Sequence, residues 1–244
     1  MTKELKFLLS IVEQAKEISK EKFTVKLKDG VNDLVTNLDV KIENFLIKKI
    51  KEEYPDFDIV SEEGNSKHQL TDNCFVIDPI DGTINFANGL PLWAIQVACR
   101  KGGKTVASVI SFPKLGETYY ADKNGAFLNG EKIQVRQVPI RNAIYLVDGG
   151  GDNLPALENM MKHSINFRHL YATCMSFASV ASGRAHGVVF RADRVWDYLP
   201  GLFLAQKAGA KIVDKPDFHG AAMNKEFLDI LIKETKKNTL KGHF

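Results

Sequence analysis

An apolar run that ends in two aspartates sets the strongest constraint on how this chain can fold. The segment CFVIDPIDGTINF, residues 74–86, begins like a buried β-strand and then places Asp78 and Asp81 three residues apart. A carboxylate at the end of a core strand is costly to bury, because a charge that loses its solvation also tends to lose its ionisation. The segment therefore requires a compensating group opposite the two aspartates, and that group is a clue to function.

Length and composition indicate a globular protein of one large unit or two closely joined ones. The chain has 244 residues, of which 44% are hydrophobic, and this is enough for a sizeable core. Its 33 basic and 30 acidic residues are spread along the chain and leave a net charge of +3. We therefore expect neither nucleic acid nor a membrane as the partner.

Several features favour a cytoplasmic location. The amphipathic N-terminal segment carries acidic residues, unlike a signal peptide, and no apolar run approaches the roughly 20 residues of a membrane span. The three cysteines, Cys74, Cys99 and Cys174, are widely spaced among apolar neighbours. This spacing suits buried thiols in a reducing compartment better than a disulfide framework or a zinc cluster.

Hydrophobic periodicity predicts a mixed α and β chain in two halves. Apolar residues at helical spacing predict helices over 3–19 and 39–53, and the strand-like runs that follow are joined by glycine-containing turns. From about residue 140 strands and helices alternate, which is typical of a layered α/β arrangement. We expect an N-terminal α+β half, 1–140, and a C-terminal α/β half, 141–244, in one compact unit.

Acidic residues recur where predicted strands stop or helices start. Asp39 follows the run DLVTN, Glu62 and Glu63 follow FDIVS, and Asp197 lies at the start of a predicted helix. Open α/β folds place ligand sites at such positions. For any one of these acids a plain turn or helix cap is an equal alternative, because short polar residues are common there.

The central motif also contains groups suited to a phosphate. Pro79 lacks an N–H and fixes its φ, so it holds a turn in which the flanking aspartates can face one point. Gly82 allows the backbone to approach a ligand closely. If Gly82 and Thr83 open a helix through INFANG, their N–H groups suit a phosphate oxygen.

Carboxylates that meet at one point need a cation. Two unit charges about 4 Å apart repel by about 4 kcal/mol at an effective dielectric near 20. Oxygen ligands without a histidine or cysteine set favour magnesium over zinc or copper. The sequence therefore predicts a magnesium site.

Four segments together resemble the metal-dependent phosphomonoesterase superfamily of inositol monophosphatase. The resemblance implies an α/β (α+β) fold, namely a layered α-β-α-β-α sandwich of the inositol monophosphatase / fructose-1,6-bisphosphatase type, and a homodimer. The order and spacing of the segments match that family over nearly the whole chain. The segments are DLVTNLD (33–39), IVSEEG (59–64), VIDPIDGTINFANGLP (76–91) and VWDYLPG (195–201).

The resemblance also implies which residues hold the metals. One magnesium would be held by Glu62, Asp78 and the backbone carbonyl of Ile80. Asp78, Asp81 and Asp197 would hold a second, so that the N-terminal half supplies most of the ligands. The family also allows a third, weaker ion supported by Glu62.

Other roles follow from the same resemblance. Asp39 and Thr83 match the pair that orients and deprotonates the attacking water, with Glu62 nearby. Lys28 falls where the family has a lysine on a mobile loop over the site, and Glu63 either joins the site or hydrogen-bonds to a ligand. Paired metals would neutralise phosphoryl oxygens, lower the pKa of a bound water and stabilise the leaving alkoxide.

The choice of substrate stays open. The inositol-specific members have a Gly-Thr-Ala segment where this chain has residues 171–173, and a glutamate where it has residues 190–192. Arg191 or Arg194 suits a second anionic group, because guanidinium pairs well with phosphate, or it simply pairs with Asp193 or faces solvent. The residues expected to contact substrate are Asp81, Gly82, Thr83, Thr173, Arg191 and Asp197.

We predict magnesium-dependent hydrolysis of a small phosphomonoester, with inositol 1-phosphate as the first substrate to test. Fructose 1,6-bisphosphate, 3′-phosphoadenosine 5′-phosphate and histidinol phosphate are the enzymatic alternatives. A non-catalytic dimeric binding partner is the alternative from another class of function. Lithium sensitivity is a further expectation from the family resemblance.

Overall fold

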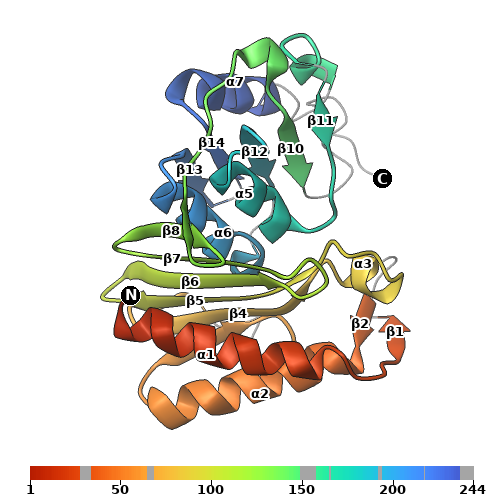
Figure 1. Cartoon of the computed structure of the whole chain (residues 1–244), viewed down its shortest axis with the longest axis vertical. Coiled ribbons are helices and arrows are strands. Elements are labelled where there is room, and N and C mark those ends of the chain that lie inside the picture. Colours follow the sequence, from red (N-terminus) through yellow and green to blue (C-terminus); the bar gives the residue numbers. More distant parts are fainter. Residues whose placement is uncertain are drawn as a thin grey trace.

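The chain forms five alternating layers of helix and sheet (Figure 1). The computed structural model describes residues 1–27, 34–64, 69–148, 158–164, 166–191, 194–216 and 218–236. A pair of helices, a large sheet, a second helix pair, a smaller sheet and a final helix follow one another along the long axis of the molecule. The predicted α-β-α-β-α sandwich is confirmed.

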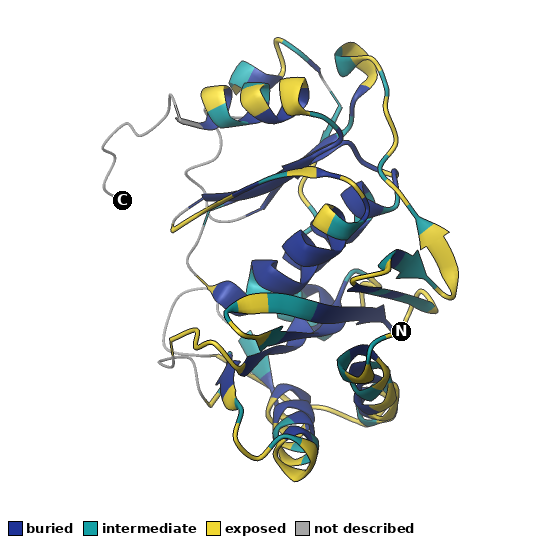
Figure 2. Cartoon of the chain, turned by 90° about the vertical axis from the view of Figure 1, so that its left-hand side faces the viewer, coloured by how far each residue is buried: buried dark blue, intermediate teal, exposed yellow. Residues whose placement is uncertain are grey.

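The outermost layer at the N-terminal end consists of α1 (Lys3–Ile18) and α2 (Asn37–Glu53). Both helices were predicted, and α2 begins two residues earlier than expected because Thr36 caps it. Thr2 caps α1 by accepting a hydrogen bond from the N–H of Leu5. Their apolar faces are buried against the large sheet, while their other faces are exposed (Figure 2). Burial of these faces fixes the first turn of α2, which carries Asp39.

The large sheet contains the strands in the order β3-β4-β5-β6-β7-β8-β9. β3 runs parallel to β4, and each later pair is antiparallel, as the glycine-containing turns predicted. β4 is buried along its whole length, so it lies in the core of the molecule. The strands span Asp58–Ser61 (β3), Cys74–Asp81 (β4), Ala94–Lys101 (β5), Lys104–Phe112 (β6), Glu117–Asp122 (β7), Gly125–Leu128 (β8) and Glu131–Ile133 (β9).

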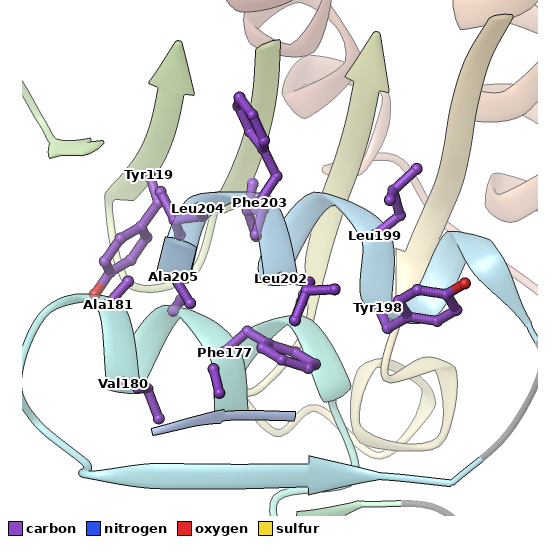
Figure 3. Close-up of a cluster of buried hydrophobic side chains, with 14 of the residues drawn as sticks. Tyr119, Phe177, Val180, Ala181, Tyr198, Leu199, Leu202, Phe203, Leu204 and Ala205 are labelled. Atoms are coloured by element: carbon purple, nitrogen blue, oxygen red, sulfur yellow. The ribbon is translucent and has the colours of Figure 1, made fainter. Parts of the chain in front are cut away.

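The middle layer is formed by α5 (Thr173–Ala181) and α6 (Val195–Lys207), which cross between the two sheets. The two helices pack closely because Gly201 has no side chain: a Cβ there would lie 2.6 Å from the Cβ of Phe177. Figure 3 shows Phe177 from α5 and Leu202 from α6 within this apolar cluster. Tight packing fixes where the first turn of each helix lies against the end of β4.

The smaller sheet has the order β11-β10-β12-β14-β13 and is covered by α7 (Lys225–Lys236). β10 runs parallel to β11 and β12, and β14 is antiparallel to both of its neighbours. β14 was not predicted. The helix expected over LPALENMMK (154–162) is described only from residue 158, and residues 158–160 are helical; the rest of its start lies outside the described residues. The strands span Tyr145–Asp148 (β10), Phe167–Arg168 (β11), Gly187–Phe190 (β12), Lys211–Lys215 (β13) and Phe218–Ala222 (β14).

Smaller elements complete the described part of the chain. An antiparallel hairpin, β1 (Val25–Leu27) and β2 (Leu34–Thr36), precedes α2, and the short helix α3 (Thr83–Ala87) follows β4. A 3₁₀ turn, η1, spans Ile140–Asn142. The three cysteines are buried free thiols, as predicted. Among the described residues, none of the helices has the length and apolar character needed to cross a membrane.

Candidate active site

The end of β4 carries two buried aspartates at an irregular point in the sheet. Asp78 pairs with Gln96 of β5 and Asp81 pairs with Ala94, so the register shifts between them. Side chains alternate across a regular strand, and residues three apart would face opposite sides. The shift at Pro79 and Ile80 allows both carboxylates to face the starts of α5 and α6.

Asp81 caps a helix that lies far away in the sequence. Its carboxylate accepts hydrogen bonds from the backbone N–H groups of Thr173, at 3.3 Å, and Cys174, at 2.7 Å. The residue at the N-cap position of α5, Ala172, has no side chain that could do so. Burial raises the pKa of Asp81 to about 6, although these hydrogen bonds act in the opposite direction. Thr173, a predicted substrate contact, thus meets Asp81 through its backbone.

Gly82 turns the chain sharply between β4 and α3. Its φ of +85° is in the left-handed region, and a Cβ there would lie 2.8 Å from the carbonyl oxygen of Leu92. Thr83 then begins α3, and its Oγ1 lies 3.0 Å from the carbonyl oxygen of Ile80 and 3.4 Å from Oδ1 of Asp39. The turn therefore brings together the predicted pair Asp39 and Thr83, which are 44 residues apart.

Asp39 is held in place by the start of its own helix. Its Oδ2 accepts a hydrogen bond of 2.8 Å from the backbone N–H of Thr36, in a capping box at the N-terminus of α2. Burial, together with a smaller contribution from the negative charge of Glu62, raises the pKa of Asp39 to about 6. This leaves Oδ1 directed toward Thr83.

Asp78 lies at the electrostatic centre of the acidic residues. It is 1% exposed, and its pKa is raised well above the ordinary value by burial and by the charges of Glu62, Asp81 and Asp197. Its Oδ2 accepts a weak hydrogen bond of 3.3 Å from Nε2 of Gln96. Its Oδ1 is buried and has no hydrogen-bond partner among the described residues, and such a group is costly unless a cation or donor meets it.

The charges of Glu62, Asp81 and Asp197 act on Asp78, but the four side chains do not form a complete metal-binding site. Within the described ranges, no group of three or more His, Cys, Asp or Glu side chains is gathered closely enough to hold a metal ion. The oxygen-only set of Glu62, Asp78, Asp81, Asp197 and the carbonyl of Ile80 nevertheless has the chemistry that magnesium prefers. A cation bound here would satisfy the buried Oδ1 of Asp78.

Glu43 anchors the loop that carries two of the predicted site residues. It is 3% exposed, and its carboxylate accepts hydrogen bonds from the N–H groups of Glu63, at 2.8 Å, and Gly64, at 2.7 Å. The loop after β3 is thereby tied to α2, with Glu62 facing the other acids. Glu43 was not predicted from the sequence, although an acid one helical turn after Asp39 on a buried face was the available signal.

Gln96 is a second residue that the sequence analysis missed. It is fully buried in β5, and its Nε2 lies 3.3 Å from Oδ2 of Asp78 and 3.4 Å from the backbone carbonyl oxygen of Asp197. The side chain therefore joins the end of β4 to the first turn of α6. A glutamine in the middle of the apolar run WAIQVACR was the signal, because a polar residue at a core position needs partners.

The remaining predicted residues lie at different places. Asp197 lies in the first turn of α6 and is close enough to raise the pKa of Asp78. Arg191 is half-buried and directly follows β12, while Arg194 is exposed at the N-cap of α6. Lys28 lies outside the described residues, so its predicted place over the site stays a prediction.

Asp148 is a further buried carboxylate near Asp81. It ends β10, accepts a hydrogen bond from Oγ of Ser176 in α5, and lies 3.7 Å from Nε2 of His169. Burial raises the pKa of Asp148 to about 7, and the charge of Asp81 raises it as well. The sequence analysis missed this residue, although an acid at the end of a predicted strand was the same signal that identified the others.

We expect Asp148 to make the stability of the metal-free protein depend on pH. Its folded pKa lies above the ordinary value of 3.8, so its contribution is fully present below about pH 4 and is lost as pH rises toward about 7. As pH rises, the free energy of unfolding of Asp148→Asn should fall less steeply than that of the wild type. The two slopes should differ by up to about 1.4 kcal/mol per pH unit. Urea unfolding in EDTA between pH 4 and 7 measures this slope, and equal slopes would exclude a raised pKa.

Comparison with known proteins identifies the family. The profile of the inositol monophosphatase family matches residues 3–229. The chain belongs to the inositol monophosphatase family. It is 32% identical over 207 residues to a fructose-1,6-bisphosphatase/inositol-1-monophosphatase of Thermotoga maritima, covering 84% of this chain and 80% of that protein. The resemblance drawn from the four motifs is confirmed.

Two further comparisons give the fold and the breadth of the family. The solved structure of the Thermotoga maritima IMPase has a TM-score of 0.87 at 27% identity, and the match covers 97% of this chain and 98% of that one. Nus factor SuhB of Salmonella typhimurium is 31% identical over 205 residues, covering 80% of this chain and 76% of SuhB. Members of the inositol monophosphatase family are phosphatases, which supports a phosphoric monoester hydrolase.

Proposed function

We propose that this protein hydrolyses a small phosphomonoester with a water activated by magnesium, and that inositol 1-phosphate is the first substrate to test. The observation that carries this proposal is the buried Oδ1 of Asp78: within the described part of the chain it has no hydrogen-bond partner, and the charges of Glu62, Asp81 and Asp197 act on Asp78. A bound cation would offset the repulsion between the carboxylates and coordinate the unsatisfied oxygen of Asp78.

The residues that would hold magnesium follow from the chemistry of their oxygens. Glu62, Asp78 and the carbonyl of Ile80 would hold one ion, Asp78, Asp81 and Asp197 a second, and Glu62 would support a weaker third. Magnesium supplies positive charge that neutralises phosphoryl oxygens, makes water more acidic and stabilises the leaving oxygen. The backbone N–H groups that hold Asp81 keep its carboxylate oriented while it binds.

Asp39 and Thr83 would orient and deprotonate the attacking water. Thr83 has one hydroxyl proton and two lone pairs, so it can donate to Oδ1 of Asp39, 3.4 Å away, while it accepts a hydrogen bond from water. The proton of the water would then pass through the Thr83 hydroxyl to Asp39. Glu62 lies close enough to raise the pKa of Asp39 and can share that proton.

Further properties belong to this proposal because the sequence and its family resemblance imply them. We infer a cytoplasmic homodimer that acts on a small phosphorylated metabolite and is inhibited by lithium. Glu63 would support the site through the loop that Glu43 anchors. Lys28, Arg191 and Thr173 would contribute to substrate binding.

Release of inorganic phosphate from a substrate panel tests the proposal. The panel contains inositol 1-phosphate, fructose 1,6-bisphosphate, 3′-phosphoadenosine 5′-phosphate and histidinol phosphate, each with magnesium and with EDTA. We expect release from at least one substrate, and we expect EDTA to abolish it. Absence of release from every phosphomonoester in the panel would overturn the enzymatic function, and undiminished release in EDTA would overturn the metal requirement.

The similarity to Nus factor SuhB favours a second candidate, a dimeric binding partner without a catalytic role. The buried acids argue for the enzyme, because a binding surface does not need carboxylates that repel one another in the core. Asp78→Asn separates the two candidates. A function that depends on binding alone would survive the substitution, whereas an enzymatic one would not.

A further inference from the structure

Tyr171 has an unusual backbone and an exposed ring beside the candidate active site. Its φ of +53° is in the left-handed region, which a bulky residue rarely adopts, yet the residue is 60% exposed. In the described part of the chain, the other non-glycine residue with positive φ is Asn129, whose type tolerates that conformation in a turn. Burial of the ring therefore does not explain why a tyrosine occupies this position.

The backbone of Tyr171 is packed directly onto the catalytic motif. Its carbonyl oxygen lies 3.2 Å from the position that a Cβ on Gly82 would take, and it is within 3.4 Å of Nδ2 of Asn85 in α3. Two residues later, the N–H of Thr173 donates to Asp81. These contacts place the backbone of Tyr171 next to the acidic residues.

A second ring holds that of Tyr171 in place. The ring of His169 stacks on it with a centroid separation of 4.1 Å and an angle of 28° between the planes. Nε2 of His169 in turn lies 3.7 Å from Oδ1 of Asp148, which is buried beneath the pair at the end of β10. The outer ring face is therefore positioned before any ligand arrives, and this reduces the entropy lost on binding.

We propose that the stacked rings of Tyr171 and His169 form a subsite for the planar aromatic group of the substrate, so that the phosphomonoester is a nucleotide. The inference rests on the proposed phosphatase function and shifts the preferred substrate from inositol phosphate to a phosphonucleoside. A nucleobase presents a flat π face to an aromatic ring, whereas inositol presents hydroxyl groups and no such face. Stacking would place the base at the rim while the phosphate enters the acidic site with the metals.

Kinetics of three variants test the subsite. The substrates are adenosine 3′-monophosphate and inositol 1-phosphate, and the measured quantity is the ratio of their KM values. Tyr171→Ala should raise the KM for the nucleotide about tenfold relative to that for inositol 1-phosphate, whereas Tyr171→Phe, which keeps the ring, should leave the ratio unchanged. Tyr120→Ala is the matched control, because Tyr120 also stacks on another ring, that of Phe127, but lies in β7.

Binding of adenosine separates this inference from the proposed function. Adenosine has no phosphate to hydrolyse, and saturation-transfer NMR detects weak binding without turnover. We expect a signal with the wild type and Tyr171→Phe and its loss in Tyr171→Ala. An unchanged KM ratio in Tyr171→Ala, or an adenosine signal that survives in it, would overturn the subsite. Failure of the wild type to hydrolyse any phosphomonoester would overturn the phosphatase function while adenosine binding still reports on the rings.

Discussion

The Asp78→Asn variant is expected to lose about 1,000-fold or more in kcat/KM and yet to unfold at a higher temperature than the wild type in EDTA. Asparagine has nearly the same shape but no charge. It removes the cost of burying a charge and the repulsion from neighbouring acids, which together raise the pKa of Asp78, so the metal-free fold becomes more stable. It also removes a proposed ligand of both magnesium ions, so a loss of about 4 kcal/mol in transition-state stabilisation follows.

Calorimetry with and without magnesium measures the two effects separately. Magnesium should raise the melting temperature of the wild type, because a ligand that binds only the folded state stabilises it, and should leave that of Asp78→Asn nearly unchanged. An Asp78→Asn variant with normal turnover would contradict the metal assignment. Lower stability of the variant in EDTA would show that the carboxylate is needed by the fold itself.

Asp122→Asn is the matched control, because Asp122 is also a fully buried aspartate at the end of a strand. Burial raises its pKa, but hydrogen bonds from the N–H groups of Asn124 and Thr2 outweigh burial and bring the pKa below its ordinary value. The charge of Asp122 is therefore stabilising. Its replacement should lower stability by about 1–3 kcal/mol and leave turnover intact, the reverse of the result for Asp78.

The sequence predicted those parts of the fold that depend on local pattern. The helical spacing of Leu5, Leu8 and Val12 predicted α1, because one apolar face had to be buried. The same reasoning missed β14, whose sequence FHGAA carries little apolar alternation. In that strand Gly220 is required by its neighbour β12, since a Cβ there would lie 2.9 Å from the carbonyl oxygen of Val188. Such a requirement comes from a partner strand and is not visible locally.

In the candidate site too, local pattern predicted some residues, whereas contacts between distant parts of the chain could not be predicted. Asp39, Asp78 and Asp197 were predicted because acids at the ends of elements need a reason to be there. The contacts that orient them could not be predicted, because they join distant parts of the chain. The hydrogen bond from the N–H of Cys174 to Asp81 joins residues 93 apart in the sequence, and no local sequence pattern predicts it. Capping of α5 by the carboxylate of Asp81 is therefore a finding of the structure.

Gly82→Ala is expected to lower the free energy of unfolding by about 2–4 kcal/mol and to reduce kcat/KM about 100-fold. The left-handed backbone at φ +85° costs an alanine roughly 1–2 kcal/mol, and its Cβ would also approach the backbone carbonyl of Leu92 to 2.8 Å. Relief of that contact has to move the turn between Asp81 and Thr83. A shift of about 1 Å in positioned groups is enough for a 100-fold loss.

Gly116→Ala separates the two causes, because Gly116 has a φ of +65° and no atom of the described residues lies within 4 Å of an added Cβ. It lies between β6 and β7, away from the acids, so the variant should lose only the roughly 1–2 kcal/mol of backbone strain and keep its activity. Urea unfolding and phosphate release measured on both variants give the comparison. If Gly82→Ala lost no more stability and activity than Gly116→Ala, the close approach of Gly82 to Leu92 would have no part in shaping the site. A larger loss in both quantities at Gly82 would show that the turn after β4 positions Asp81 and Thr83 because no side chain is present there.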